Sequence, residues 1–163
     1  MNKIQIALKD QIIDTVKNIK KHNVGEILNW LLRNQIAKYS LANDYYFSTQ
    51  FTQDHIKKKG LDITKRSIKT KKNEITYEHP IPSKVVFNLI LKAKNENEII
   101  SILKKTDYIV ILSHFEDVKL RDKGLVSSMP ENWKYGDDVF ARYREASIKV
   151  LPKKIKMIGA IRR

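Results

Sequence analysis

The segment Tyr108–Leu112, which reads YIVIL, constrains the fold of this chain more than any other feature of its sequence. A strand with one solvent-facing side alternates apolar and polar residues, whereas a continuous apolar run indicates a strand that is covered on both faces. Polar residues bound the run on either side. The sequence therefore predicts a central β-strand against which other elements pack.

Helical spacing of apolar residues dominates the rest of the chain. Leu8, Ile12, Val16 and Ile19 predict a first helix with lysines between them, and a second helix follows Gly25. Further helices are expected over 51–59 with a cap at Gly60, from Ser83, over 96–105, from Ser113 and over 139–146. The aromatic cluster at 45–47 is interpreted as a loop and the tail 148–163 as extended chain.

A second strand is predicted where Ile75 and Tyr77 alternate with Thr76 and Glu78, before two prolines end it. These elements predict an α+β fold, in which a mostly helical chain surrounds a small antiparallel β-hairpin that forms a ββα unit with the helix after it. Residues 1–60 are expected to form an N-terminal helical region. Residues 61–163 would hold the ββα unit, and the two regions are expected to pack as one domain.

Composition favours a polyanionic partner. The chain has 163 residues, of which 32 are Lys or Arg and 18 are Asp or Glu, so its net charge is +14, while 42% hydrophobic residues suffice for a folded core. Such an excess of charge opposes folding by self-repulsion, and nucleic acid is the first partner that would relieve it. Ribosome association and anionic membrane surfaces are the alternatives.

Several basic side chains are candidate phosphate contacts. They stand in two lysine runs and beside Tyr143 on a predicted helix, and the full set is Lys57, Lys58, Lys59, Lys71, Lys72, Arg142 and Arg144. The alternative interpretation is that these residues form ordinary solvated faces.

The residues that the chain lacks exclude several classes of chemistry. Without cysteine, disulfides, thiolate zinc sites and cysteine nucleophiles are excluded.

No apolar run approaches the roughly 20 residues that span a bilayer. The first residues carry charges throughout and lack the apolar block of a signal peptide, so we expect a cytoplasmic protein without a membrane span.

Titratable residues gather at the ends of the two predicted strands. Glu78 and His79 close the first, and a helix follows the second with His114 and Asp117 three positions apart on one face. This helix opens with the S-x-x-E capping signal of Ser113. A neutral imidazole accepts a proton near pH 7, and carboxylates are hard ligands for Mg²⁺ or Mn²⁺. If the strands pair antiparallel, these groups would suit phosphodiester hydrolysis.

The sequence Glu78-His79-Pro80-Ile81-Pro82, followed by YIVILSHFEDVKLRDKGL, resembles the HNH (His-Me finger) endonucleases. The resemblance covers roughly 74–148. It implies that His79 is the general base and that Glu78 and Asp117, or His114 in another register, bind Mg²⁺ or Mn²⁺. It also implies DNA as the substrate, a restriction or defence role, and a homodimer where both strands are cut.

The chain departs from this family in three respects. The cysteine pairs of many members are missing, two predicted helices separate the strands, and the middle asparagine has no unique counterpart among Asn88, Asn95 and Asn97. Two other interpretations therefore stay open. One is a non-catalytic nucleic-acid-binding protein in which His79 bonds a backbone carbonyl, and the other is an RNA-cleaving toxin.

Overall fold

The computed structural model describes residues 1–22, 26–65 and 74–158 and has an α+β fold. In this part of the chain there are seven helices and a four-stranded mixed sheet. The helices are α1 (Lys3–His22), α2 (Glu26–Leu41), α3 (Gln50–Lys58), α5 (Ser83–Lys92), α6 (Glu96–Thr106), α7 (His114–Asp122) and α8 (Ala141–Glu145). The strands are β1 (Tyr45–Ser48), β2 (Ile75–Glu78), β3 (Val110–Ser113) and β4 (Ile155–Lys156).

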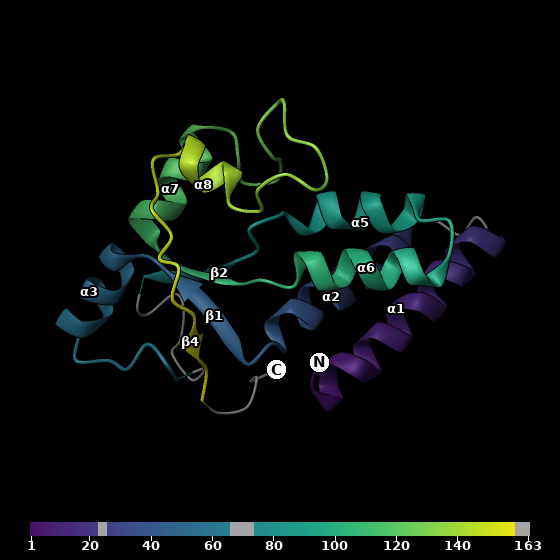
Figure 1. The fold of residues 1–163 in the computed structure, drawn as a ribbon, viewed down its shortest axis with the longest axis horizontal. Helices are drawn as coiled ribbons and strands as arrows, with labels where there is room; N and C mark the ends of the chain where they lie inside the picture. Colours follow the sequence, from purple (N-terminus) through teal and green to yellow (C-terminus); the bar gives the residue numbers. More distant parts are fainter. Residues whose placement is uncertain (23–25, 66–73, 159–163) are drawn as a thin grey trace.

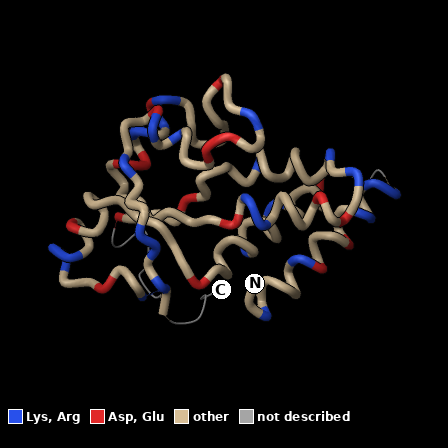
Figure 2. Tube along the Cα trace, in the orientation of Figure 1, with Lys and Arg blue, Asp and Glu red and all other residues tan. Residues whose placement is uncertain are grey.

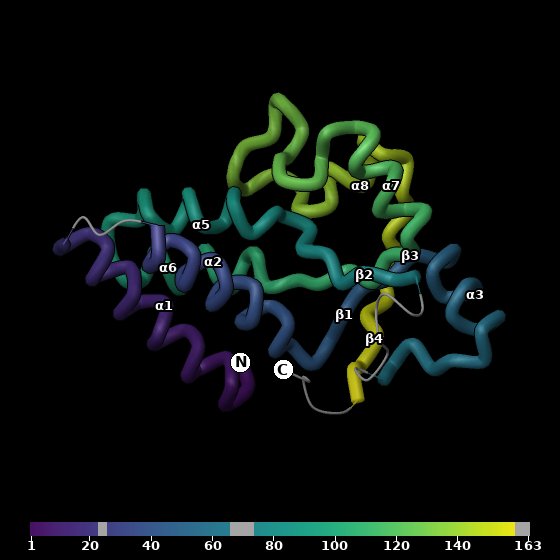
Figure 3. The backbone as a smooth tube through the Cα atoms, turned by 180° about the vertical axis from the view of Figure 1, so that it is seen from behind, coloured from purple at the N-terminus to yellow at the C-terminus, as the bar shows by residue number. Residues whose placement is uncertain are grey.

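The elements gather in two halves. Figure 1 shows α1, α2, α5 and α6 side by side, with the sheet, α3, α7 and α8 next to them, and Figure 3 shows the same arrangement from behind. The helical half has its own core, in which Ile12 and Val16 of α1 meet Leu32, Ile90 and Leu103 of the other three helices. The predicted apolar face of the first helix is thus confirmed as the face that it buries.

The sheet has the strand order β2-β3-β1-β4. Strand β3 pairs antiparallel with β2, and Val110 of β3 lies opposite Glu78. On its other side β3 pairs parallel with β1, and Val110 lies opposite Phe47. Strand β4 pairs antiparallel with β1. A strand of the N-terminal region therefore lies between strands of the C-terminal region, so one sheet joins the two.

Strand β3 is central and every residue in it is buried, as its sequence predicts. Val110 and Leu112 pack toward α7 and α8, whereas Ile111 packs toward α3. Each face of the strand is thus covered by helices. Strands β2 and β3 are not joined by a turn, because α5 and α6 lie between them, and the sheet is larger than the small hairpin that the sequence predicts.

The prediction of a loop at 45–47 was wrong. These residues form β1, because Tyr46 and Phe47 pack into the cores on opposite faces of the sheet. Three aromatic residues in succession hide the alternation that identifies a strand. The helix expected from Ser83 does begin at that residue, but Pro82 occupies the cap position and the Ser83 side chain makes no capping bond.

Two helix-end signals are confirmed. Ser113 and Glu116 form the expected capping box of α7, with the Ser113 hydroxyl accepting a bond from the Glu116 N–H at 3.3 Å. Gly60 follows α3 with a φ of +67°, which glycine adopts without strain. Among the described helices, none combines the length and apolar character needed to cross a bilayer.

Candidate functional site

A buried arginine organises the end of β2. Arg142 of α8 has no exposed surface, and its Nη2 donates to Glu78 Oε2 at 2.7 Å and to the His79 carbonyl. Its Nη1 donates to the carbonyls of Leu125 and Val126, at 2.7 and 3.2 Å. The guanidinium therefore ties β2 to the loop between α7 and α8.

The carboxylate of Glu78 lies on the α7–α8 side of the sheet, because Ile75 and Tyr77 of the same strand pack on the α3 side. Burial raises the pKa of Glu78, while the charge of Arg142 opposes that rise and the charge of Asp117 adds to it. The structure thus brings Glu78 and Asp117 close enough to influence each other. Asp117 also forms an ion pair with Arg121, one helical turn onward, with 3.2 Å between Asp117 Oδ2 and Arg121 Nη2.

The imidazole of His79 has a different environment. It makes a hydrogen bond with the main chain of Ala37 on α2, and its Nε2 is buried without a hydrogen-bond partner. Burial lowers the pKa of His79 to about 4, the bond to Ala37 acts in the opposite direction, and the charge of Arg142 lowers the pKa further. The ring is therefore neutral at physiological pH.

His114 is exposed at the first position of α7, where its main-chain N–H donates to the Glu74 carbonyl at 2.7 Å. Within residues 1–22, 26–65 and 74–158, no three His, Asp or Glu side chains are placed so as to hold a metal ion. With Glu78 committed to Arg142 and His79 to α2, these residues do not fit Mg²⁺ in this arrangement.

The other predicted phosphate contacts are scattered. Lys57, Lys58 and Lys59 are exposed at the end of α3, whereas Lys71 and Lys72 lie outside the described residues. Arg144 is exposed and pairs with Asp138. Arg142 points into the protein, where backbone carbonyls and the Glu78 carboxylate accept hydrogen bonds from its two terminal nitrogens. Its guanidinium therefore does not reach a surface where a phosphate would bind.

Glu116 was not among the predicted site residues, although its capping role was recognised. Its side chain is buried, and its Oε2 accepts from the Thr52 hydroxyl at 2.6 Å, the Ser113 hydroxyl at 3.0 Å and the Ser113 N–H at 3.2 Å. Since Thr52 belongs to α3, this carboxylate fixes the start of α7 against the start of α3.

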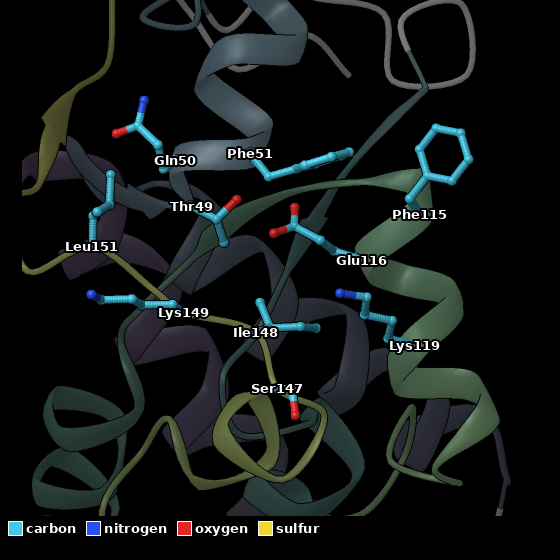
Figure 4. A pocket seen from close by; sticks show the side chains of 10 residues that line it. All are labelled: Thr49, Gln50, Phe51, Phe115, Glu116, Lys119, Ser147, Ile148, Lys149 and Leu151. Carbon is cyan, nitrogen blue, oxygen red and sulfur yellow. The ribbon is translucent and has the colours of Figure 1, made fainter.

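A pocket of about 580 Å³ opens beside this contact (Figure 4). It lies between the first turns of α3 and α7 and the segment 147–151. Its walls are formed by Thr49, Gln50, Phe51, Phe115, Glu116, Lys119, Ser147, Ile148, Lys149 and Leu151. No local pattern in the sequence indicates this pocket, because the three stretches that form it meet only in the folded chain.

Two exposed aromatic rings stand at this pocket. Phe51 and Phe115 are 53% and 60% exposed, and their centroids lie 6.2 Å apart with an interplanar angle of 82°. Each ring belongs to the first turn of a capped helix, so both are held by well-anchored backbone. Exposed apolar groups that contact each other mark binding surfaces more often than single exposed apolar residues do.

The segment 147–158 leads away from the pocket and carries no acidic residue. Its four lysines, Lys149, Lys153, Lys154 and Lys156, are all exposed. In Figure 2 the trace from α8 down to β4 shows their positions as repeated blue stretches. We call residues 147–158, with these four lysines, the lysine segment.

The chain matches no protein-family model, and no curated protein or solved structure is significantly similar to it.

Proposed function

We propose that this protein binds nucleic acid, and that the lysine segment is its principal contact with the phosphate backbone. The observation that carries the proposal is the row of four exposed lysines, without an acid among them, beside a pocket with exposed aromatic rings. Lysines that neutralise phosphates release condensed counterions, and this gain favours binding to any sequence.

The backbone of the lysine segment is held in place by the sheet. Leu151 donates its N–H to the Ser48 carbonyl at 2.9 Å, and Met157 donates to the Asp44 carbonyl at 2.8 Å. Between them Lys154 lies over two aromatic rings, 5.2 Å from the centre of Phe47 and 5.3 Å from that of Tyr108. The lysines are therefore presented on a fixed edge of the sheet rather than on a free tail.

The proposal is tested with two triple variants that remove the same amount of charge. In the first, Lys149→Gln, Lys153→Gln and Lys156→Gln remove lysines of the segment. In the control, Lys84→Gln, Lys92→Gln and Lys104→Gln remove exposed lysines of α5 and α6. Affinity for a labelled duplex is measured by fluorescence anisotropy over a range of salt concentrations.

The first triple variant is expected to weaken binding and to flatten the plot of log K against log salt by about 0.9 for each phosphate that is no longer neutralised. The control variant should keep the wild-type slope, because its lysines lie on the helical half. An equal decrease in affinity for both variants would mean that net charge alone acts. Absence of wild-type binding both to this duplex and to single strands would refute the proposal.

A metal-dependent DNA endonuclease of the HNH type is the second candidate. Three features favour it. Strand β2 pairs antiparallel with β3, and α7 follows β3 directly. Glu78 and Asp117 also lie close enough to interact. In the present arrangement Arg142 occupies Glu78 and Ala37 engages His79. Catalysis at this centre would require both of these interactions to be released.

Cleavage assays separate the two candidates. Wild type and His79→Ala are incubated with plasmid DNA and Mg²⁺ or Mn²⁺, with EDTA in a parallel reaction, and with RNA to test for an RNA-cleaving toxin. Metal-dependent cleavage that disappears in His79→Ala, while DNA binding and the unfolding midpoint are kept, would support the endonuclease. Binding by the wild type without cleavage under any metal would support the binding protein alone.

A further inference from the structure

We propose that the pocket between α3, α7 and residues 147–151 binds one unstacked nucleotide of a single-stranded nucleic acid. This inference rests on the proposed nucleic-acid binding and adds the kind of strand that is bound. The base would stack on the face of one of the two nearly perpendicular rings, Phe51 or Phe115, and the adjoining phosphates would bind Lys119 and Lys149.

The rings provide the stacking surface. A base–aromatic contact tolerates any sequence, because each base has a π-face, and it requires the base to leave its own stack. The ring pair is preorganised, since Thr49 and Ser113 cap the two helices and the 2.6 Å bond between Thr52 and Glu116 joins them. Ligand binding would therefore not have to order these helices.

The pocket has the size of a small-ligand site. Its volume of about 580 Å³ falls within the usual range of roughly 300–1,000 Å³ for such sites. Ile148 is buried and Leu151 is half-buried, so the wall opposite the α7 side chains contains an apolar part. A paired base within a duplex is enclosed by its neighbours and does not enter a pocket of this kind, so the fit favours an unpaired strand.

Charge orients the nucleotide. Figure 4 shows Glu116 and Lys119 projecting from α7 toward the pocket, with Lys149 on the other side. The Glu116 carboxylate repels a phosphate but can accept hydrogen bonds from the N–H groups of a base. The exposed ammonium groups of Lys119 and Lys149 attract phosphates. The base is thus directed inward, toward Glu116, and the backbone outward, toward the lysine segment.

The test compares strands of one mixed sequence of about 12 nucleotides, a length within the usual site size of a single-strand-binding domain. Single-stranded DNA, single-stranded RNA and the blunt DNA duplex are titrated against the wild type, Phe51→Ala/Phe115→Ala, and Phe51→Tyr/Phe115→Tyr. Trp30→Ala is the control, because Trp30 is 66% exposed on α2 in the helical half. Lys119→Glu probes the phosphate contact without touching the rings.

We expect the affinity of the double alanine variant for the preferred single strand to fall by about tenfold or more, because stacking contributes that much per base. Its duplex affinity should stay within twofold of wild type. The double tyrosine variant should retain binding, Trp30→Ala should behave as wild type, and Lys119→Glu should weaken single-strand binding. The tighter of the DNA and RNA strands identifies the kind of strand that the protein prefers.

Two results would overturn this inference while leaving the proposed function intact. One is wild-type binding that the double alanine variant does not change, and the other is an equal decrease in affinity for single strands and duplex. Failure of the wild type to bind any of the three nucleic acids would instead refute nucleic-acid binding itself.

Discussion

Replacement of Arg142 by alanine is predicted to destabilise the protein severely. The guanidinium donates to three carbonyls and to the Glu78 carboxylate, and no part of it is exposed. Breaking a buried ion pair by removing one partner costs about 3–5 kcal/mol, because the other charge stays behind. Removing the three bonds to carbonyls, at a net of about 1 kcal/mol each, leads to a similar figure. We therefore expect the free energy of unfolding to fall by about 4 kcal/mol.

Urea unfolding followed by circular dichroism measures this decrease. The cycle of Arg142→Met, Glu78→Gln and the double variant isolates the ion pair, and the double variant should be destabilised by less than the two single variants together. Arg144→Ala is the matched control, since Arg144 lies on the same helix but is exposed. A decrease in the free energy of unfolding below about 1 kcal/mol for Arg142→Ala would refute the stabilising role of Arg142, because a value that small is typical of a surface ion pair.

Three further predictions concern buried polar groups. Since burial lowers the pKa of His79 from 6.5 to about 4, the free energy of unfolding should fall by up to about 3 kcal/mol as pH falls from 6.5 to 4. NMR titration of His79 checks the pKa. Acid unfolding checks the stability, and His79→Gln should lose less stability than wild type over this range. Burial raises the pKa of Asp107 from 3.8 to about 6, so the charge of this carboxylate opposes folding at pH 7. Asp107→Asn should therefore stabilise the protein by about 2 kcal/mol at pH 7. Urea unfolding should show that this gain in stability vanishes below pH 4. Thr52→Val removes the bond to buried Glu116 and should cost about 1–3 kcal/mol in urea unfolding, whereas Thr64→Val, which breaks a bond to an exposed carboxylate, should cost about 0.5 kcal/mol. Unchanged stability in Thr52→Val would mean that the bond between Thr52 and Glu116 does not hold α3 and α7 together.

Local signals predicted the parts of the fold that depend on local contacts. The apolar run ending at Leu112 became the buried central strand, and the capping signal at Ser113 became a complete capping box. Acids at the start of α6 and lysines at its end mark a helix that the structure places over Glu96–Thr106. These features lie within one or two turns of chain, so the sequence alone contains them.

Features that depend on distant segments were not predictable in this way. Strand β1 is a strand because β3 and β4 pair with it, and both follow it by a long stretch of chain. The sequence around Arg142, with Arg144 two positions on, is typical of an exposed helix face, yet acceptors from β2 and the α7–α8 loop bind the Arg142 side chain. Glu78 and His79 are adjacent in sequence, yet their side chains bond to different helices, α8 and α2, which adjacency alone does not indicate.

The parallel pairing of β1 with β3 sets the order in which a nascent chain can assemble. Helices α1 and α2 can pack on each other as soon as they leave the ribosome, since their contact is local. Strand β1 must wait, with Tyr46 and Phe47 uncovered, until α5, α6 and β3 have been made, because Phe47 is aligned with Val110. Contacts between such distant segments close slowly, and an apolar edge that is left open meanwhile is prone to self-association. Synthesis of this protein is therefore most vulnerable to aggregation in the interval between the emergence of β1 and that of β3.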